Sequence, residues 1–138
     1  MLARAKHLIV LSPLLSLATL LLSCGNGGVF CFFTSINVSA TTTSTADHSA
    51  VAPGNQVHFA AFGSGLTAGC VATQSSLMNV TWSASDSQNV TISNAKDATF
   101  GTATCVHATN GPVTVTATLP SDLNNGTAAS GTSTMTCQ

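Results

Sequence analysis

The sequence has very little charge. Asp, Glu, Lys and Arg make up only 5% of its 138 residues, against roughly 25% in an average globular protein. It contains no Glu and no Tyr, and its bases are Arg4, Lys6 and Lys96. No basic patch can form from so few bases, which excludes binding to a nucleic-acid backbone and a polybasic contact with membrane lipids.

Motifs for catalytic or metal chemistry are missing as well. The sequence has no His-Glu-x-x-His, no Gly-x-Ser-x-Gly and no phosphate-binding loop. It has no Cys-x-x-Cys pair, and its widely spaced cysteines do not predict a zinc site. The acids Asp86, Asp97 and Asp122 are isolated in predicted turns, where Asp is common, and calcium binding there is a weaker alternative. We therefore predict no enzymatic activity, no cofactor and no metal site.

Segments suited to long helices are missing beyond residue 23. Thr, Ser, Ala, Asn, Val and Gly dominate there; Thr and Val favour strands, while Gly and Asn favour turns. Alternating apolar residues separated by turn signals predict about seven short strands and an all-β sandwich. The predicted strands are 36–40, 56–62, 77–84, 89–93, 99–107, 113–119 and 127–137, with Gly63-Ser64-Gly65 ending the second and Val57, Phe59, Val80, Trp82, Val113 and Val115 in the core.

The first 23 residues have the organisation of a secretory signal peptide. Two bases precede an apolar run, 8–22, of 15 residues, which is shorter than the roughly 20 needed to span a bilayer. The run ends in Leu21-Leu22-Ser23-Cys24, which resembles the lipobox of bacterial lipoproteins. The resemblance implies cleavage before Cys24, a diacylglyceryl thioether on its sulfur and usually a further acyl chain, such as palmitate, on the new amino group. An uncleaved anchor, or a secreted protein with Cys24 in a disulfide, are the alternatives.

Cleavage before Cys24 sets the predicted organisation of the chain. Residues 1–23 are the signal peptide, 24–33 the lipidated cysteine with a short tether, and 34–138 one domain. The mature chain keeps one base and four acids, a formal charge of −3. Gly25 is not the Asp that retains many lipoproteins in the inner membrane, so the resemblance favours the outer membrane in a Gram-negative host.

Three stretches of the domain are similar to the bacterial immunoglobulin-like domain family. They are Pro53-Gly54-Asn55-Gln56-Val57-His58-Phe59, Val80-Thr81-Trp82-Ser83-Ala84-Ser85-Asp86 and residues 111–118. The resemblance extends over about residues 34–137. It implies an immunoglobulin-like Greek-key sandwich with a structural or adhesive role and without catalytic residues. The cysteines and the long segment 63–76 depart from the family pattern.

The cysteines that remain after lipidation are Cys31, Cys70, Cys105 and Cys137. An even number in an exported chain predicts two disulfides. If the strand order is immunoglobulin-like, the first two lie at one end of the sandwich and the last two at the other. That order favours Cys31–Cys70 and Cys105–Cys137. The competing arrangement joins Cys70 to Cys105 and leaves the outer two paired together or free.

The sequence leaves three functions open for such an envelope protein. The first is a structural or adhesive domain that binds a protein partner at the cell surface. The second is a carbohydrate-binding module that uses segment 63–76 and rows of Thr and Asn, with Trp82 exposed as a platform for sugars. The third is an accessory or inhibitory subunit of an envelope complex that docks through the apolar segment 29–33, which is otherwise the start of the first strand.

Overall fold

The computed structural model describes residues 31–41, 48–67, 70 and 75–138. The predicted signal peptide, Cys24 and residues 29–30 of the apolar segment lie outside these ranges. Within the part of the chain that the structure describes, no helix is long and apolar enough to cross a bilayer.

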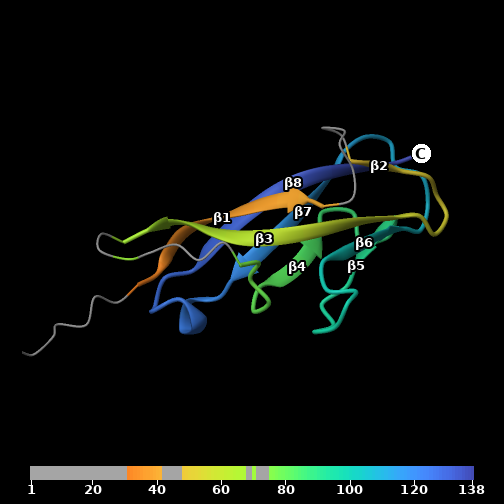
Figure 1. Cartoon of the computed structure of the whole chain (residues 1–138). Coiled ribbons are helices and arrows are strands. Elements are labelled where there is room, and N and C mark those ends of the chain that lie inside the picture. The colour runs from red at the N-terminus through yellow and green to blue at the C-terminus, as the bar shows by residue number, and fades with distance from the viewer. Residues whose placement is uncertain (1–30, 42–47, 68–69, 71–74) are drawn as a thin grey trace, which may run out of the picture.

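The described chain forms two four-stranded sheets (Figure 1). One sheet has the order β1-β3-β6-β5 and the other the order β2-β8-β7-β4. All neighbouring strands are antiparallel except β2 and β8, which are parallel. The elements are β1 (Phe33–Ala40), β2 (Ser49–Ala50), β3 (Gln56–Leu66), β4 (Thr81–Ala84), β5 (Val90–Ile92), β6 (Thr102–Cys105), β7 (Val113–Leu119), the short 3-10 helix η1 (Ser121–Leu123) and β8 (Ala129–Cys137).

The core fills the space between the two sheets. In β7, Val113, Val115, Ala117 and Leu119 are buried while the residues between them are half-buried or exposed. This alternation follows from the pleat, which turns successive side chains to opposite faces of a sheet. The all-β class predicted from such patterns is confirmed. All six predicted core residues, Val57, Phe59, Val80, Trp82, Val113 and Val115, are buried.

The two sheets approach closely where β1 passes β8. Gly131 in β8 lies against the backbone carbonyl of Ile36 in β1, and a Cβ at this position would overlap that carbonyl. Ile36 itself points into the core. A glycine therefore lets the edge strand of one sheet close over the other sheet.

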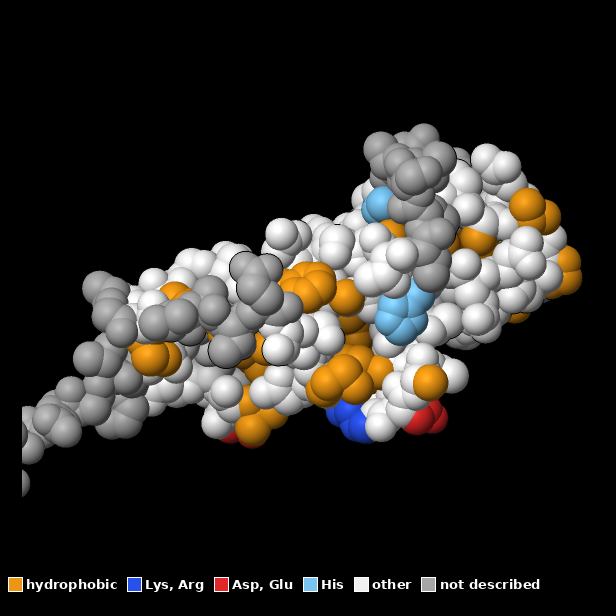
Figure 2. All heavy atoms as spheres, in the orientation of Figure 1, with side chains coloured by type: hydrophobic (Ala, Val, Ile, Leu, Met, Phe, Trp, Pro, Cys, Tyr) orange, Lys and Arg blue, Asp and Glu red, His pale blue; other side chains and the backbone are white. Residues whose placement is uncertain are grey.

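The outer surface is neutral and rich in hydroxyl groups. On the face shown in Figure 2, acidic and basic side chains are confined to the lower edge. On the second sheet, β7 and β8 pair hydroxyl residues in register: Thr114 with Thr134, Thr116 with Thr132, and Thr118 with Ser130. A partner of these faces would meet hydroxyl groups rather than charge.

The prediction that Gly63-Ser64-Gly65 ends a strand is wrong. β3 continues through these residues to Leu66 and pairs with the first half of β1. The ring of Phe33 occupies the space that a side chain at Gly63 would need. The glycine accommodates a neighbouring aromatic ring here instead of breaking the strand.

Other strand boundaries also differ from the prediction. β2 lies in the polar stretch between the first two predicted strands and raises the number of strands to eight. It consists of two residues paired with the end of β8, so it has too little pattern to detect. Of the predicted strand 77–84 only Thr81–Ala84 forms, and of 99–107 only Thr102–Cys105.

Candidate functional site

Two disulfides hold opposite ends of the sandwich. Cys31 is bonded to Cys70 and Cys105 to Cys137, with Cα–Cα distances of 5.7 and 5.6 Å. This is the pairing that an immunoglobulin-like strand order favours. Disulfides of this kind form and persist in oxidising compartments. The two bonds therefore indicate that the domain resides outside the reducing cytosol.

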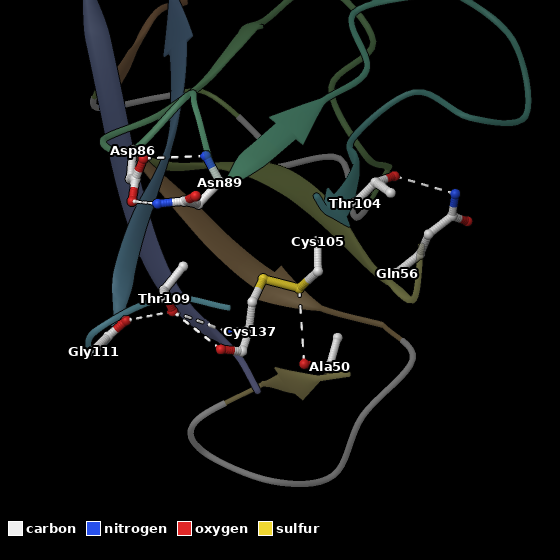
Figure 3. The surroundings of a disulfide bond; sticks show 9 residues. All are labelled: Ala50, Gln56, Asp86, Asn89, Thr104, Cys105, Thr109, Gly111 and Cys137. Carbon is white, nitrogen blue, oxygen red and sulfur yellow. Dashed lines mark hydrogen bonds between the residues drawn. A yellow bond between two sulfur atoms is a disulfide. The ribbon is translucent and has the colours of Figure 1, made fainter. Parts of the chain in front are cut away.

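The Cys105–Cys137 disulfide joins the two sheets at the end where the chain terminates (Figure 3). Both residues are fully buried. The Cys105 sulfur lies 3.8 Å from the carbonyl oxygen of Ala50. This is a packing contact, because a disulfide sulfur carries no proton to donate. The bond thus connects β6, β8 and the short β2 at one point.

Thr109 fixes the backbone of Cys137. Its N–H donates to the Cys137 carbonyl at 2.9 Å, and the Cys137 N–H donates to its Oγ1 at 3.1 Å. The Thr109 hydroxyl donates in turn to the carbonyl of Gly111 at 2.8 Å (Figure 3). The end of β8 is thereby hydrogen-bonded on the side opposite to β2.

The Cys31–Cys70 disulfide marks the other end of the sandwich. Cys31 lies two residues before the start of β1, and Cys70 follows β3. Asn124, buried in the loop between β7 and β8, completes this end. Its Oδ1 accepts from the N–H of Phe33 at 2.8 Å, and its Nδ2 donates to the carbonyl of Phe33 at 2.8 Å. The amide side chain thus pairs with β1 as a neighbouring strand would.

Asn94 has the same role on β4, the edge strand of the second sheet. Its Oδ1 accepts from the N–H of Trp82 at 2.7 Å, and its Nδ2 donates to the carbonyl of Trp82 at 3.0 Å. The register of β4 with β7 turns these two backbone groups away from β7. Exposed edge strands are liable to pair with other chains. Two asparagines therefore cover backbone groups on two edge strands.

Asn124→Ala should lower the free energy of unfolding by about 1–3 kcal/mol, because it leaves partly buried backbone groups without these partners. The wild-type amide also donates to the carbonyl of Thr127, and the side chain is only 3% exposed. Chemical denaturation of the oxidised protein measures the change. Asn37→Ala is the matched control, since Asn37 is exposed on β1. Equal losses in the two variants would contradict a role for Asn124 at the strand edge.

Trp82 lies at the centre of an aromatic cluster. Its ring centroid is 6.5 Å from that of Phe59 and 6.1 Å from that of Phe100. The side chain is 3% exposed. The indole Nε1–H has no hydrogen-bond partner among the described residues. A sugar-stacking platform requires an exposed ring, so this burial counts against such a role for Trp82.

An open apolar groove of about 720 Å³ lies between the segment before β4 and η1. Met78 and Leu123, which are 48% and 54% exposed, contribute to its lining. Lys96 also lines the groove, with its Nζ 4.0 Å from the Phe100 ring centroid and bonded to the carbonyls of Met78 and Val80. In Figure 2 hydrophobic side chains gather next to the one blue patch on the face shown. The groove is a candidate contact surface.

The ionisable residues support local turns. Asn89 donates to the Asp86 carboxylate at 2.7 Å and holds the pKa of Asp86 below its ordinary value of 3.8. The Thr99 hydroxyl, also at 2.7 Å, lowers the pKa of Asp97 in the same way. A lowered pKa in the folded state means that this stabilisation is present above pH 3.8 and is lost as the pH falls further.

The three histidines of the described chain occupy separate places. His58 bonds Thr102 through Nδ1 at 3.1 Å, His48 packs edge-on to Phe59, and His107 is exposed beyond the end of β6. Among the residues that the structure describes, no three His, Cys, Asp or Glu side chains gather in a way that could hold a metal ion.

No protein-family model matches this chain, and no curated protein sequence matches it.

The sequence located some features of these ends and missed others. The structure places all four predicted disulfide cysteines in bonds, while the predicted lipidation site, Cys24, lies outside the described residues. Asn94, Asn124 and the groove were not predicted. Asn94 and Asn124 lie in polar loop sequence, where the residue type alone indicates a turn, so no local signal marks them.

Proposed function

We propose that this protein is a bacterial lipoprotein that holds a single immunoglobulin-like domain at the membrane of the cell envelope. The observation that carries the proposal is the pairing of the cysteines. With Cys31, Cys70, Cys105 and Cys137 bonded in two pairs, Cys24 is the one of five that lies outside both. The lipobox-like motif assigns a lipid thioether to this residue. Because Gly25 is not the Asp that retains many lipoproteins in the inner membrane, we propose the outer membrane as the location if the host is Gram-negative.

The strand order supports the immunoglobulin-like topology. Such domains place strands A, B, E and D in one sheet and C, F and G in the other. Here β1-β3-β6-β5 would be A, B, E and D, and β4, β7 and β8 would be C, F and G, with β2 beside the last. Trp82 then lies on strand C, where immunoglobulin domains carry their buried Trp. The disulfide differs, since it joins β6 to β8 instead of B to F.

The proposed role is structural or adhesive, through contacts with a protein partner at the cell surface. The neutral, hydroxyl-rich sheet faces and the loops are the surfaces available for this. Burial of Trp82 weakens the case for a carbohydrate-binding module, which would use it as a platform. The docking role of segment 29–33 is also weakened, because Phe33 packs against the domain's own core.

Cys24→Ala should release the protein from the membrane fraction. Two or more acyl chains give stable anchoring, whereas a chain without them has no such attachment. Membrane fractionation of cells that express the two forms measures the change, and mass spectrometry of the wild-type amino terminus should find a cleaved, lipid-modified Cys24.

Ser23→Ala is the matched control for this test, since it keeps a small residue before the cleavage site and should stay in the membrane. An unmodified amino terminus at any residue other than Cys24 would refute the lipoprotein proposal. Screening the oxidised domain against an array of glycans then separates the two kinds of partner, and strong glycan binding would favour the carbohydrate-binding alternative.

A further inference from the structure

The apolar groove lies at the end of the sandwich from which the chain leaves toward Cys24. Leu123 lines the groove, and its neighbour Asn124 binds both backbone groups of Phe33 at the start of β1. The C-terminus lies at the opposite end (Figure 1). Any anchor that precedes β1 therefore holds the groove end closer to the membrane than the C-terminal end.

The length of the chain before β1 limits how far this end can be from the lipid. Cys24 and Cys31 are seven residues apart in the sequence. A fully extended chain of that length spans at most about 25 Å. The Cys31–Cys70 disulfide holds Cys31 to the domain, so the span cannot be lengthened by peeling β1 away. A domain tethered so closely is in frequent contact with the membrane surface.

The chemistry of the groove suits the lipid interface better than an electrostatic contact. The mature chain has a formal charge of −3, so the protein as a whole is not attracted to anionic lipids. The ammonium of Lys96 is engaged by the carbonyls of Met78 and Val80. The groove instead offers the exposed side chains of Met78 and Leu123, and burial of apolar area drives attachment to an interface.

We propose that the groove formed by Leu77, Met78, Val80, Pro120 and Leu123 rests on the lipid interface of the membrane in which Cys24 is anchored, and fixes the orientation of the domain there. The inference rests on the proposed lipidation of Cys24. It assigns the groove a function that the anchor alone does not have. The lipid holds this end of the domain near the membrane, and the groove fixes how the domain is oriented against the lipid surface.

The test uses the full lipidated protein in phosphatidylcholine vesicles with ordinary or brominated acyl chains. Leu123→Trp and Met78→Trp place a reporter in the groove, and Val51→Trp places one at another exposed apolar residue, which is 56% exposed and adjoins β2 at the C-terminal end. Trp82 is present in all three variants, and its fluorescence is removed by subtracting the signal of the wild-type protein. Brominated lipid should quench the two groove reporters and leave Val51→Trp unchanged. The loss of fluorescence should persist in about 1 M salt, where charge interactions are screened within about 3 Å.

Vesicle flotation separates failure of the groove from failure of the anchor. If the variants float with the vesicles and the groove reporters are not quenched, the groove does not contact lipid and the inference is overturned. Equal quenching of Val51→Trp would overturn it as well, because the domain would then have no preferred orientation. A blue-shifted groove reporter without quenching would mean that protein covers the groove instead. If no variant floats, the lipoprotein proposal fails, and the inference fails with it.

Discussion

Replacing Cys105 and Cys137 together by alanine should lower the free energy of unfolding by about 3–6 kcal/mol. Loss of the cross-link accounts for about 2–4 kcal/mol of this, because the unfolded chain regains the freedom of a closed loop. Loss of two buried sulfur atoms accounts for about 1–2 kcal/mol. Both residues are fully buried where β6, β8 and β2 meet, so removing their sulfur atoms leaves a cavity that solvent-exposed side chains cannot fill.

The double variant of Cys31 and Cys70 is the matched control. The two disulfides close loops of similar length, with sequence separations of 39 and 32 residues, so the entropic effects should be nearly equal. Cys31 is exposed, however, and little packing is lost with it. Guanidinium unfolding of the oxidised proteins should therefore show a smaller loss for Cys31 and Cys70. A loss as large as that for Cys105 and Cys137 would contradict the contribution of packing.

Trp82→Ala should destabilise the domain by about 3–5 kcal/mol, the usual range for a large aromatic side chain removed from a core. The indole joins Phe59 and Phe100 between the sheets. Trp82→Phe should cost much less, about 1–2 kcal/mol, since it keeps a ring in the cluster and removes an N–H group that has no partner among the described residues.

Urea unfolding followed by far-ultraviolet circular dichroism measures both variants, because the only tryptophan is lost in each. The informative quantity is the difference between them. If Trp82→Phe is as destabilising as Trp82→Ala, the indole N–H makes a hydrogen bond that contributes to stability. A stable, fully folded Trp82→Ala variant would contradict the central place of this side chain in the core.

Much of the sandwich could be predicted from local sequence pattern. Val113 to Leu119 alternates strictly between buried and outward residues, and Ile36 and Val38 do so in β1. A period of two is the direct result of the pleat, so these strands are evident without knowledge of their neighbours. The cysteine pairs required more, since they depend on which strand ends lie together. The resemblance to a known topology was needed to choose among the pairings.

The features that could not be predicted depend on contacts between distant parts of the chain. Gly63 and Gly131 occupy places where a ring or a carbonyl from β1 leaves no room for a side chain. In the sequence alone, a glycine within a strand can indicate a break or a bulge as readily as a close approach of another group. Asn124 binds β1, which is 91 residues away in the sequence, and Asn94 binds β4, which is 12 residues away. Their position is determined by the assembled sheets, so no periodic pattern in the sequence marks them.

The two disulfides also determine how the molecule would respond to a pull between its ends. Cys31 and Cys137 lie at opposite ends of the domain, and each is bonded to a partner nearer the middle of the sequence. A stretching force therefore passes through both bonds and only through the backbone from Cys70 to Cys105, which are 35 residues apart. That segment extends to roughly 120 Å at most, whereas the whole chain from Cys31 to Cys137 would extend to roughly 370 Å. Even when unfolded by tension, the oxidised domain would lengthen to only a third of its contour and remain a short covalent link.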